Sequence, residues 1–471
     1  MKSYLSLLSL ITTLALLHSC HAPHTYLLEA SKEAQAIYRI MPPADLPIEA
    51  AGNAQAGFEY LIYGDYVGNG IPLEIFSKLF GQMEDTVLRR KGDNANMPYP
   101  FNVFESYYGE KVVSGNCFAC HASSIDGEVI LGLGDSFGAF NKNRRTATAI
   151  LNWMVKRKFG KNSSAWEAYR EHGKWLQVVA AATVVDNPGV NPALRIEEST
   201  LAYRNSEDLS FQPNPNFDIP KRAFGANVPA LWTMQKKNAL YYNGMGRGDF
   251  TKLLMQACLL GIHDSTAARV VQQNFKDVIA WIKQLKPPAY PKAINHQLAA
   301  KGKGIFEDNC SKCHGKYGKD AYFPNKIIPL DEIKTDPYYA LYALQSPANE
   351  WYNKSWFSQT SPKAYSQPSY GYMASPLDGI WATAPYLHNG AVPTLSALLN
   401  SKERPTYWKM QTEDAGYDYE NIGRRYIHKS SGIGKKTYNT QLPGYGNQGH
   451  TFSDSLSLDQ REAILEYLKT L

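Results

Sequence analysis

A five-residue motif occurs twice in this chain of 471 residues. Residues 117–121 read CFACH and residues 310–314 read CSKCH, so both copies follow the pattern Cys-x-x-Cys-His. Two cysteines at this spacing can bond to the two vinyl groups of one porphyrin, and the histidine that follows can bind its iron. The sequence therefore predicts two covalently bound haem c groups, attached through Cys117, Cys120, Cys310 and Cys313, with His121 and His314 as iron ligands.

Two other kinds of site also use cysteine pairs: a structural zinc ion, and a redox-active or disulfide-bonded dithiol. The paired knuckles of a zinc site usually lie within about 20 residues of each other. Here nearly two hundred residues separate the motifs. The chain has only 11 histidines, so a histidine directly after both cysteine pairs is not expected by chance. Haem attachment accounts for both observations.

The N-terminus has the pattern of an export signal. Lys2 precedes an apolar run over 5–17 that is too short to cross a bilayer, and Ser19 and Cys20 follow. Residues 1–19 are therefore expected to be a signal peptide. Residues 17–20 resemble a bacterial lipobox, in which Cys20 would be lipidated; ordinary cleavage nearby is the alternative. We expect a periplasmic protein, anchored to the outer membrane if Cys20 carries lipid.

The composition is that of an ordinary globular protein, with 44% hydrophobic and 20% charged residues. The formal net charge of +6 is modest and spread along the chain, so we expect neither nucleic-acid binding nor a membrane-surface patch. Membrane contact would then come only from lipid on Cys20. The other cysteine outside the motifs, Cys258, lies in the apolar run 253–260, which is typical of a buried, unreactive thiol.

The expected fold is mainly α-helical, with two cytochrome c-like haem domains, long irregular loops and an N-terminal extension. Helical patterns cover 146–159, 164–185, 249–262 and 265–285. The last of these is stopped by Pro287 and Pro288, which mark a boundary. We therefore divide the chain into an extension (20–109) that packs on a haem domain, a first haem domain (110–290) and a second haem domain (291–471).

The second haem domain has further helical signals. Small residues over 299–304 allow a helix before the second motif to pass close to other backbone, and Ser457 with Gln460 matches a capping box before an apolar stripe. In the first domain, glycines over 127–134 would let the backbone approach a flat group such as a porphyrin, or simply form a glycine-rich hairpin. The irregular stretch 187–228 is expected to cover a site.

Residues 377–395 read LDGIWATAPYLHNGAVPTL and form the most specific stretch after the two motifs. Together with the motifs and the terminal residues 466–471, this segment resembles the bacterial di-haem cytochrome c peroxidase superfamily. That group includes the bacterial peroxidases, the di-haem enzyme of methylamine utilisation and the rubber oxygenases. The resemblance is best over 295–471, looser over 110–290 and absent from 20–110.

The resemblance implies an oxidoreductase with two unequal haems. In the peroxidases of this group the N-terminal haem is the reactive one and the C-terminal haem relays electrons. A tryptophan between the haems assists transfer, and Trp232 resembles that residue, with a core aromatic as the alternative. The implied partners are a small oxidant, peroxide or else dioxygen, and a small electron-donor cytochrome or cupredoxin. A calcium ion between the domains is common in the peroxidases, and this sequence assigns no ligands to it.

The sixth ligand of the second iron departs from the peroxidase pattern. Residues 396–404 lack the methionine that the peroxidases place after the corresponding motif, so we expect a histidine, which lowers the reduction potential relative to methionine. His450 is favoured and His388 is the alternative. Weaker candidates are Met373, Met410 and His428.

The first iron has no obvious sixth ligand, since each candidate is better explained as structural; these are His172, Met154, Met234, Met245 and His263. An open position suits peroxide or dioxygen chemistry. Peroxide cleavage needs an acid/base group, for which Glu128 is our first candidate, with Asp126 and His172 behind it. An apolar pocket that includes Phe224 would suit an oxygenase better. The rival class is a di-haem electron carrier without a substrate site.

Overall fold

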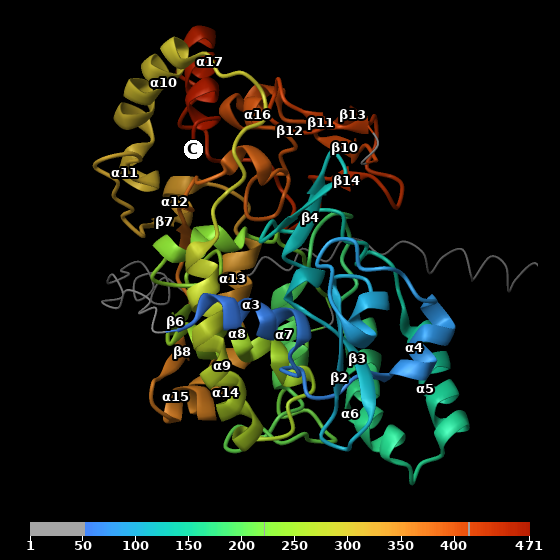
Figure 1. Ribbon diagram of the computed structural model, residues 1–471. Helices are drawn as coiled ribbons and strands as arrows, with labels where there is room; N and C mark the ends of the chain where they lie inside the picture. Colours follow the sequence, from blue (N-terminus) through green and yellow to red (C-terminus); the bar gives the residue numbers. More distant parts are fainter. Residues whose placement is uncertain (1–51, 221, 413–414) are drawn as a thin grey trace, which may run out of the picture.

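The computed structural model describes residues 52–220, 222–412 and 415–471 (Figure 1). The expected signal peptide and Cys20 lie outside these residues. The described part is 41% helical and 13% strand, with many irregular segments. Helix predominates, as expected, but this part of the chain also contains six small antiparallel sheets that the sequence did not indicate. None of its helices is long and apolar enough to cross a membrane.

The first part of the chain mixes helices with short strands. In order these are α3 (Ala54–Tyr63), β1 (Ile71–Pro72), α4 (Leu73–Phe80), β2 (Phe101–Glu105), β3 (Lys111–Gly115), β4 (Ala122–Ile125), β5 (Glu128–Leu131), α5 (Arg145–Phe159), α6 (Ser164–Ala182), α7 (Ala193–Leu201), β6 (Gly246–Gly248), α8 (Phe250–Met255) and α9 (Ser265–Gln284). The helix predicted over 249–262 is instead two pieces, α8 and a 3-10 turn over Gln256–Leu260.

Helices α3 and α9 pack along each other. Each begins at a residue whose side chain accepts backbone N–H groups of the first turn, Asn53 for α3 and Asp264 for α9. On α9 the residues Val271, Phe275 and Ile282 lie at helical spacing on the buried face. This pairing attaches the segment before the first motif to the body of the protein.

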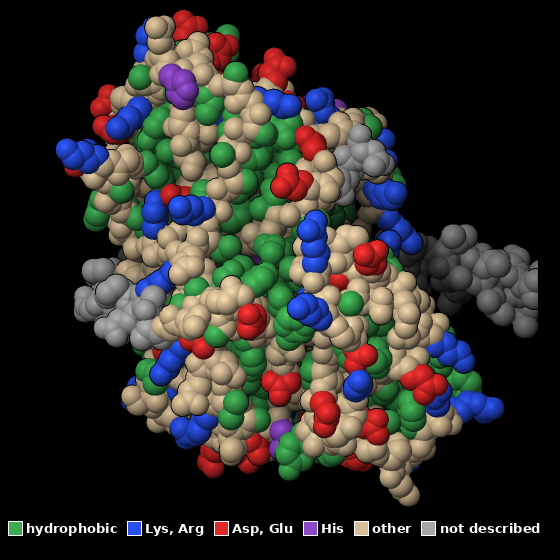
Figure 2. All heavy atoms as spheres, in the orientation of Figure 1, with side chains coloured by type: hydrophobic (Ala, Val, Ile, Leu, Met, Phe, Trp, Pro, Cys, Tyr) green, Lys and Arg blue, Asp and Glu red, His purple; other side chains and the backbone are tan. Residues whose placement is uncertain are grey.

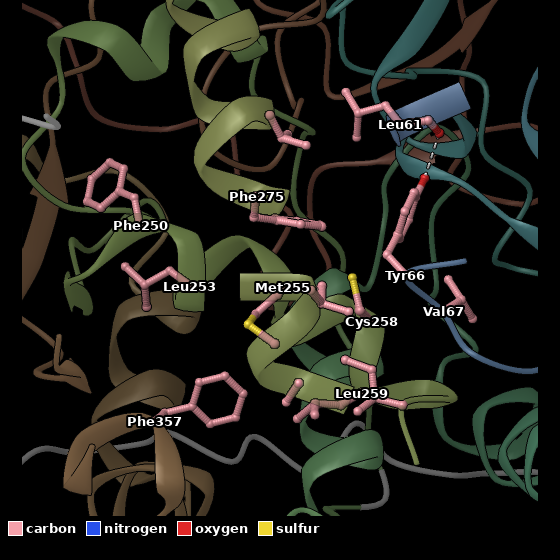
Figure 3. Close-up of a cluster of buried hydrophobic side chains, with 14 of the residues drawn as sticks. Leu61, Tyr66, Val67, Phe250, Leu253, Met255, Cys258, Leu259, Phe275 and Phe357 are labelled. Carbon is pink, nitrogen blue, oxygen red and sulfur yellow. Dashed lines mark hydrogen bonds between the residues drawn. The ribbon is translucent and has the colours of Figure 1, made fainter. Parts of the chain in front are cut away.

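The largest buried cluster joins three distant parts of the sequence (Figure 3). Leu61 and Tyr66 come from the N-terminal part, Cys258 and Phe275 from the α8–α9 region, and Phe357 from beyond the predicted boundary at 290. Cys258 is 3% exposed, as expected of an unreactive core thiol. Residues 348–364 therefore complete a core that is otherwise built from the first half of the chain.

The second part of the chain contains α10 (His296–Asn309), α11 (Ser311–His314), β7 (Ile327–Pro329), α12 (Leu330–Ile333), α13 (Tyr338–Gln345), α14 (Ala348–Lys354), α15 (Trp356–Gln359), β8 (Ala364–Ser366), β9 (Gly371–Met373), α16 (Leu395–Leu399), β10 (Tyr407–Met410), β11 (Tyr417–Asp418), β12 (Gly423–Arg424), β13 (Tyr426–His428), β14 (Tyr438–Asn439) and α17 (Leu458–Leu468). Strand β8 pairs with β6, which is a second link across residue 290.

Helices α10 and α17 lie side by side at one end of the molecule (Figure 1). The contact requires glycine at position 302, because a Cβ there would overlap the backbone oxygen of Ala463. Helix α17 begins with the predicted capping box, in which the Ser457 and Gln460 side chains bond to each other's backbone N–H groups. The predicted close approach of the helix before the second motif to other backbone is therefore confirmed, and the backbone it meets is that of α17.

Candidate functional site

The second Cys-x-x-Cys-His motif lies where α10 runs into α11. The Nδ1 atom of His314 is 2.9 Å from the carbonyl oxygen of Ser375, and the Tyr317 hydroxyl donates to the His314 carbonyl oxygen at 3.0 Å. A hydrogen bond from Nδ1 to a carbonyl fixes the tautomer and leaves Nε2 as the ligand atom, as is usual for metal-binding histidines. Burial lowers the pKa of His314, so the ring is neutral and able to bind a metal.

His450 faces His314 across a gap. The two ring centroids are 6.2 Å apart and the ring planes are inclined at 64°. Two imidazoles on opposite sides of one metal ion, with metal–nitrogen bonds of about 2 Å, have centroids roughly 6 Å apart. Burial lowers the pKa of His450 to about 4, so this ring is also neutral. The spacing therefore fits one iron between the two histidines.

The loop that carries His450 is held by Arg404. Its guanidinium donates to the carbonyl oxygens of Asn447, Gly449 and His450 at 2.7, 2.6 and 3.0 Å. The backbone N–H of His450 donates to the Ile333 carbonyl oxygen at 2.8 Å. His450 itself has a positive φ of 45°, which is uncommon for a residue with a side chain. These contacts fix an unfavourable backbone conformation that turns the imidazole toward His314.

A cavity of about 220 Å³ surrounds this histidine pair. Its wall includes both motif cysteines and a mainly apolar set of side chains: Ile328, Tyr372, Met373, Tyr386, Leu398, Leu399 and Phe452. A porphyrin is a flat, largely apolar group, and the two thiols are where its vinyl groups would bond. Burial raises the pKa of Cys310 to about 11, so the free thiol is protonated. The residues present fit haem c.

Lys237 lies on the wall of the same cavity. Burial lowers the pKa of its ammonium to about 8. Within the part of the chain that the structure describes, no carboxylate lies within salt-bridge distance of Lys237, whereas its neighbour Lys236 pairs with Asp378 at 2.7 Å. A poorly solvated cation at the edge of an apolar cavity favours an anionic group nearby. The propionates of a porphyrin would supply that negative charge.

His388 also lines this cavity, but its ring packs against tyrosines and does not face His314. Its ring stacks on Tyr372 with centroids 4.1 Å apart and is approached edge-on by Tyr242 and Tyr339. Its Nε2 is buried and has no hydrogen-bond partner among the described residues. His388 is therefore part of an aromatic wall, while His450 is the ring that stands opposite His314.

The first motif begins in a 3-10 turn over Cys117–Ala119. Asn116 caps this turn by accepting the Phe118 N–H at 2.9 Å, and the Cys117 N–H contacts the Tyr66 hydroxyl at 3.2 Å. The Cys120 sulfur accepts from the Asn191 side chain at 3.2 Å. Burial raises the pKa of Cys117 to about 11, so this thiol is also protonated. Asn191 comes from the irregular stretch 187–228, which indeed lies over the motif.

His121 leads directly into the β4–β5 hairpin. The N–H of Gly132, after the hairpin, donates to the His121 carbonyl oxygen at 2.8 Å. Burial lowers the pKa of His121 to about 4, and the backbone of Pro229 opposes this shift. Pro229 also lines the cavity of the second motif. The segment around Pro229 therefore lies between the two motifs.

The glycines after the first motif are contacted by protein. A Cβ at Gly132 would lie 3.1 Å from Leu285 and 3.4 Å from the Trp232 ring, and one at Gly134 would overlap the Val228 carbonyl oxygen. Of the two alternatives for these glycines, Gly132 and Gly134 therefore fit the glycine-rich hairpin better than a backbone that approaches a porphyrin. They allow the 228–232 segment to approach the hairpin instead.

Trp232 is fully buried at this junction. Its indole lies against Gly132 on the first-motif side, and its Nε1 donates to the Asp378 carbonyl oxygen on the second-motif side at 2.8 Å. Gly379 has a positive φ of 62° and lies close enough that a Cβ would be 3.2 Å from the indole nitrogen. Trp232 is also a core aromatic, so its bridging role is a prediction that its location supports.

None of the three acid/base candidates has a described contact with His121 of the first motif. Glu128 is exposed at the start of β5. The carboxylate of Asp126 accepts from the Tyr417 N–H and the Tyr419 hydroxyl, both at 2.8 Å. His172 is buried on α6 against Trp175. A catalytic role for Glu128 remains a prediction without a structural contact behind it.

The remaining ligand candidates are dispersed. Met234 and Met245 are buried in separate apolar clusters, Met373 lines the second cavity, Met154 is half-buried on α5, Met410 packs in a different cluster, and His263 and His428 are exposed. Phe224 packs edge-on against Tyr338, Tyr339 and Tyr342. Among the described residues, no three His, Cys, Asp or Glu side chains gather as a protein-only metal site would require. This gives no support to zinc, and calcium stays unassigned.

The residues that support the two motifs have no local sequence signal. Ser375, which orients His314, and Arg404, which holds the His450 loop, have no motif around them. Lys237 is one of 49 basic residues, and its burial could not be read from its neighbours. Asn191 lies in the stretch 187–228, which was expected to cover a site. That expectation was the only sequence signal for the contact of Asn191 with the first motif.

Comparison with known proteins identifies one domain-family match. Residues 371–409 match the model described as RoxA-like, cytochrome c-like. This range contains the segment 377–395, His388 and part of the wall of the second cavity. The match indicates a haem c-binding cytochrome region and, at that level, an oxidoreductase.

Two proteins of Sinorhizobium fredii are similar to longer parts of the chain. Uncharacterized protein y4iJ is 32% identical over 257 residues, which cover 40% of this chain and 41% of y4iJ. Uncharacterized protein y4iM is 26% identical over 306 residues, which cover 57% of this chain and 69% of y4iM. The chain thus spans about two-fifths of the length of y4iJ, and neither name carries a function.

Proposed function

We propose that this protein is a periplasmic di-haem c-type cytochrome oxidoreductase that reduces hydrogen peroxide at its N-terminal haem and receives the electrons through its C-terminal haem. The observation that carries the proposal is the His314–His450 pair, 6.2 Å apart in a cavity that also contains Cys310 and Cys313. A site closed by protein on both sides suits electron relay, because no position is left for a substrate.

At the second site each residue has a distinct role. Cys310 and Cys313 would attach the porphyrin, His314 and His450 would both bind its iron, and Lys237 would pair with a propionate. Bound there, the haem supplies one-electron redox chemistry, at a potential lowered by two nitrogen ligands. The apolar wall excludes water, and Ser375 and Arg404 keep both imidazoles oriented.

The first site differs in a way that suits a reaction with a small molecule. Cys117, Cys120 and His121 would hold the N-terminal haem. Among the described residues no histidine ring packs against His121 as His450 packs against His314. That difference supports an iron with one protein ligand and one position open to peroxide. Trp232, in contact with the hairpin of the first site and the wall of the second, would carry electrons between them.

Dioxygen activation on an organic substrate is the second candidate. The RoxA-like description of the matching domain favours it, since the description is not that of a peroxidase. The exposed position of Glu128 favours it too, because peroxide cleavage requires an acid/base group near the iron. The proposed electron donor is a small cytochrome or cupredoxin, and lipid on Cys20 would anchor the protein to the outer membrane.

Three measurements on the purified full-length protein test the proposal. Mass spectrometry and haem absorbance should give two covalent haems, and the double variants Cys117→Ser/Cys120→Ser and Cys310→Ser/Cys313→Ser should each retain one. The reduced protein should bind one equivalent of carbon monoxide; no binding would identify an electron carrier instead. Stopped-flow mixing with peroxide and, separately, with oxygen should show rapid oxidation by peroxide. Faster oxidation by oxygen would favour the second candidate.

A further inference from the structure

Helix α5 stands out from the body of the protein, in contact mainly with α6 (Figure 1). Of its 15 residues only Val155 is buried. Ile150 and Trp153 are 53% and 58% exposed, and their spacing of three residues places them on one face, opposite Val155. A tryptophan and an isoleucine are thus presented to solvent side by side on a helix that has no partner over that face among the described residues.

The charged residues of this helix and its flanking residues are all positive. Between Lys142 and Lys161 the chain has seven lysines and arginines and no aspartate or glutamate. These seven positive charges exceed the formal net charge of +6 of the whole chain, and all seven residues are exposed. The Arg157 guanidinium lies 5.4 Å from the Trp153 ring. The expectation that the positive charge is spread along the chain is therefore wrong for this segment, where seven basic residues gather.

Helix α4 continues this surface. Ile75 of α4 and Val155 of α5 share a small buried cluster, and Glu74 pairs with Lys158 across the two helices. At and after the end of α4, Leu79, Phe80 and Met83 are 43%, 60% and 58% exposed. Figure 2 shows hydrophobic and basic side chains together over α4 and α5, at the lower right of the molecule.

We propose that α5 and the end of α4 form a docking face for an anionic phospholipid membrane. Helices that lie in the membrane interface combine exposed Trp, Phe, Leu or Ile with lysines and arginines that pair with lipid phosphates. Charge alone would serve an acidic protein partner, but it would not account for Trp153, Ile150 and Phe80 in water. The face adds a protein contact to the lipid anchor expected at Cys20, and it does not depend on the haem chemistry.

The test uses the full-length holoprotein carrying Cys20→Ser, so that no lipid is attached. We expect it to co-sediment with vesicles containing phosphatidylglycerol at low salt, and at least tenfold less with pure phosphatidylcholine vesicles or in high salt. Replacing Ile150 and Trp153 together by serine, or Lys156 and Arg157 together by glutamate, should each reduce binding at least tenfold. Trp153→Phe should remove any blue shift of tryptophan fluorescence on binding.

Matched controls lie at the other end of the molecule. Leu458→Ser removes a side chain that is 66% exposed on α17, and Lys301→Glu reverses an exposed charge on α10. Both should bind vesicles like the parent protein. Unchanged haem absorbance and circular dichroism in every variant would exclude misfolding. Equal binding to both kinds of vesicle, loss in the controls alone, or binding only to an acidic protein would each overturn the proposal.

Discussion

The indole nitrogen of Trp232 donates a hydrogen bond to the carbonyl oxygen of Asp378 over 2.8 Å. Asp378 lines the cavity of the second motif, and the other edge of the indole meets Gly132, whose N–H bonds to His121. One side chain therefore contacts the structural surroundings of both motifs. This position is the observation behind the proposal that Trp232 carries electrons between the two motifs.

Trp232→Phe tests this bridge. Phenylalanine keeps most of the apolar packing but loses the hydrogen bond to Asp378, so we expect a loss of about 1–2 kcal/mol in unfolding free energy. The rate of electron transfer between the haems should fall at least tenfold, as measured by fast mixing or photolysis of the half-reduced protein. Trp408→Phe, which changes an equally buried tryptophan in another cluster, is the control. An unchanged rate with intact haem spectra would make Trp232 a packing residue.

His450→Ala should open the second iron. Without the ring that faces His314, the reduced protein should bind two equivalents of carbon monoxide rather than one. His450→Met should instead keep six ligands and raise the reduction potential of that haem, because thioether sulfur favours ferrous iron. The exposed His428 offers a matched control, since His428→Ala should change neither property. If His388→Ala rather than His450→Ala produces the second carbon monoxide site, the ligand assignment is wrong.

Lys237→Met should make the reduction potential of the second haem more negative. Removing a positive charge from the cavity wall stabilises the oxidised form, and a charge interaction of roughly 1–2 kcal/mol corresponds to several tens of millivolts. Redox titration followed by absorbance measures the shift. Lys237→Arg retains the charge and should restore most of the potential, while Lys301→Met changes an exposed lysine and should leave it unaffected. Equal reduction potentials in all variants would show that the charge of Lys237 does not interact with the haem.

Glu197 should make stability depend on pH. Burial raises the pKa of this α7 carboxyl to about 8, although the Tyr241 hydroxyl donates to it at 2.7 Å. Because the pKa is higher in the folded state than the ordinary value of 4.5, the stabilisation is complete below about pH 4.5 and is lost as the pH rises toward 8.

Glu197→Gln keeps a hydrogen-bonding group in place but cannot ionise. We therefore expect the unfolding free energy in urea to fall between pH 5 and pH 8 by of order 1–3 kcal/mol more in the wild type than in the variant. Glu350→Gln, on an exposed ion pair, is the control and should follow the wild type. If the unfolding free energies of Glu197→Gln and the wild type depend on pH in the same way, Glu197 is not the source of the pH dependence.

Local sequence signals predicted much of the architecture. The second motif ends at His314, which faces His450, the capping box of Ser457 and Gln460 begins α17, and Gly302 is where α10 meets α17. These signals succeed because each depends on residues a few positions apart. The missing methionine predicted a histidine ligand but did not choose between His450 and His388, and the rings of His314 and His450, with centroids 6.2 Å apart, support the choice of His450.

Long-range arrangement was harder to predict. The return of residues 348–366 into the first core has no local signal, because α14, α15 and β8 are short and of ordinary composition. The same is true of Arg404, whose bonds to the His450 loop span more than 40 residues. The glycines near Trp232 are an example. The sequence indicated that another group approaches them closely, but it did not indicate that this group is the 228–232 segment.

The shared core of Cys258, Phe275 and Phe357 has a consequence for the order in which the molecule matures. A ribosome makes the first motif long before it makes Phe357, so the core beside that motif cannot close while the chain is still growing. The same delay continues past Cys313. If both motifs attach haem, as proposed, the porphyrins would be bonded to an incompletely folded chain before this core closes.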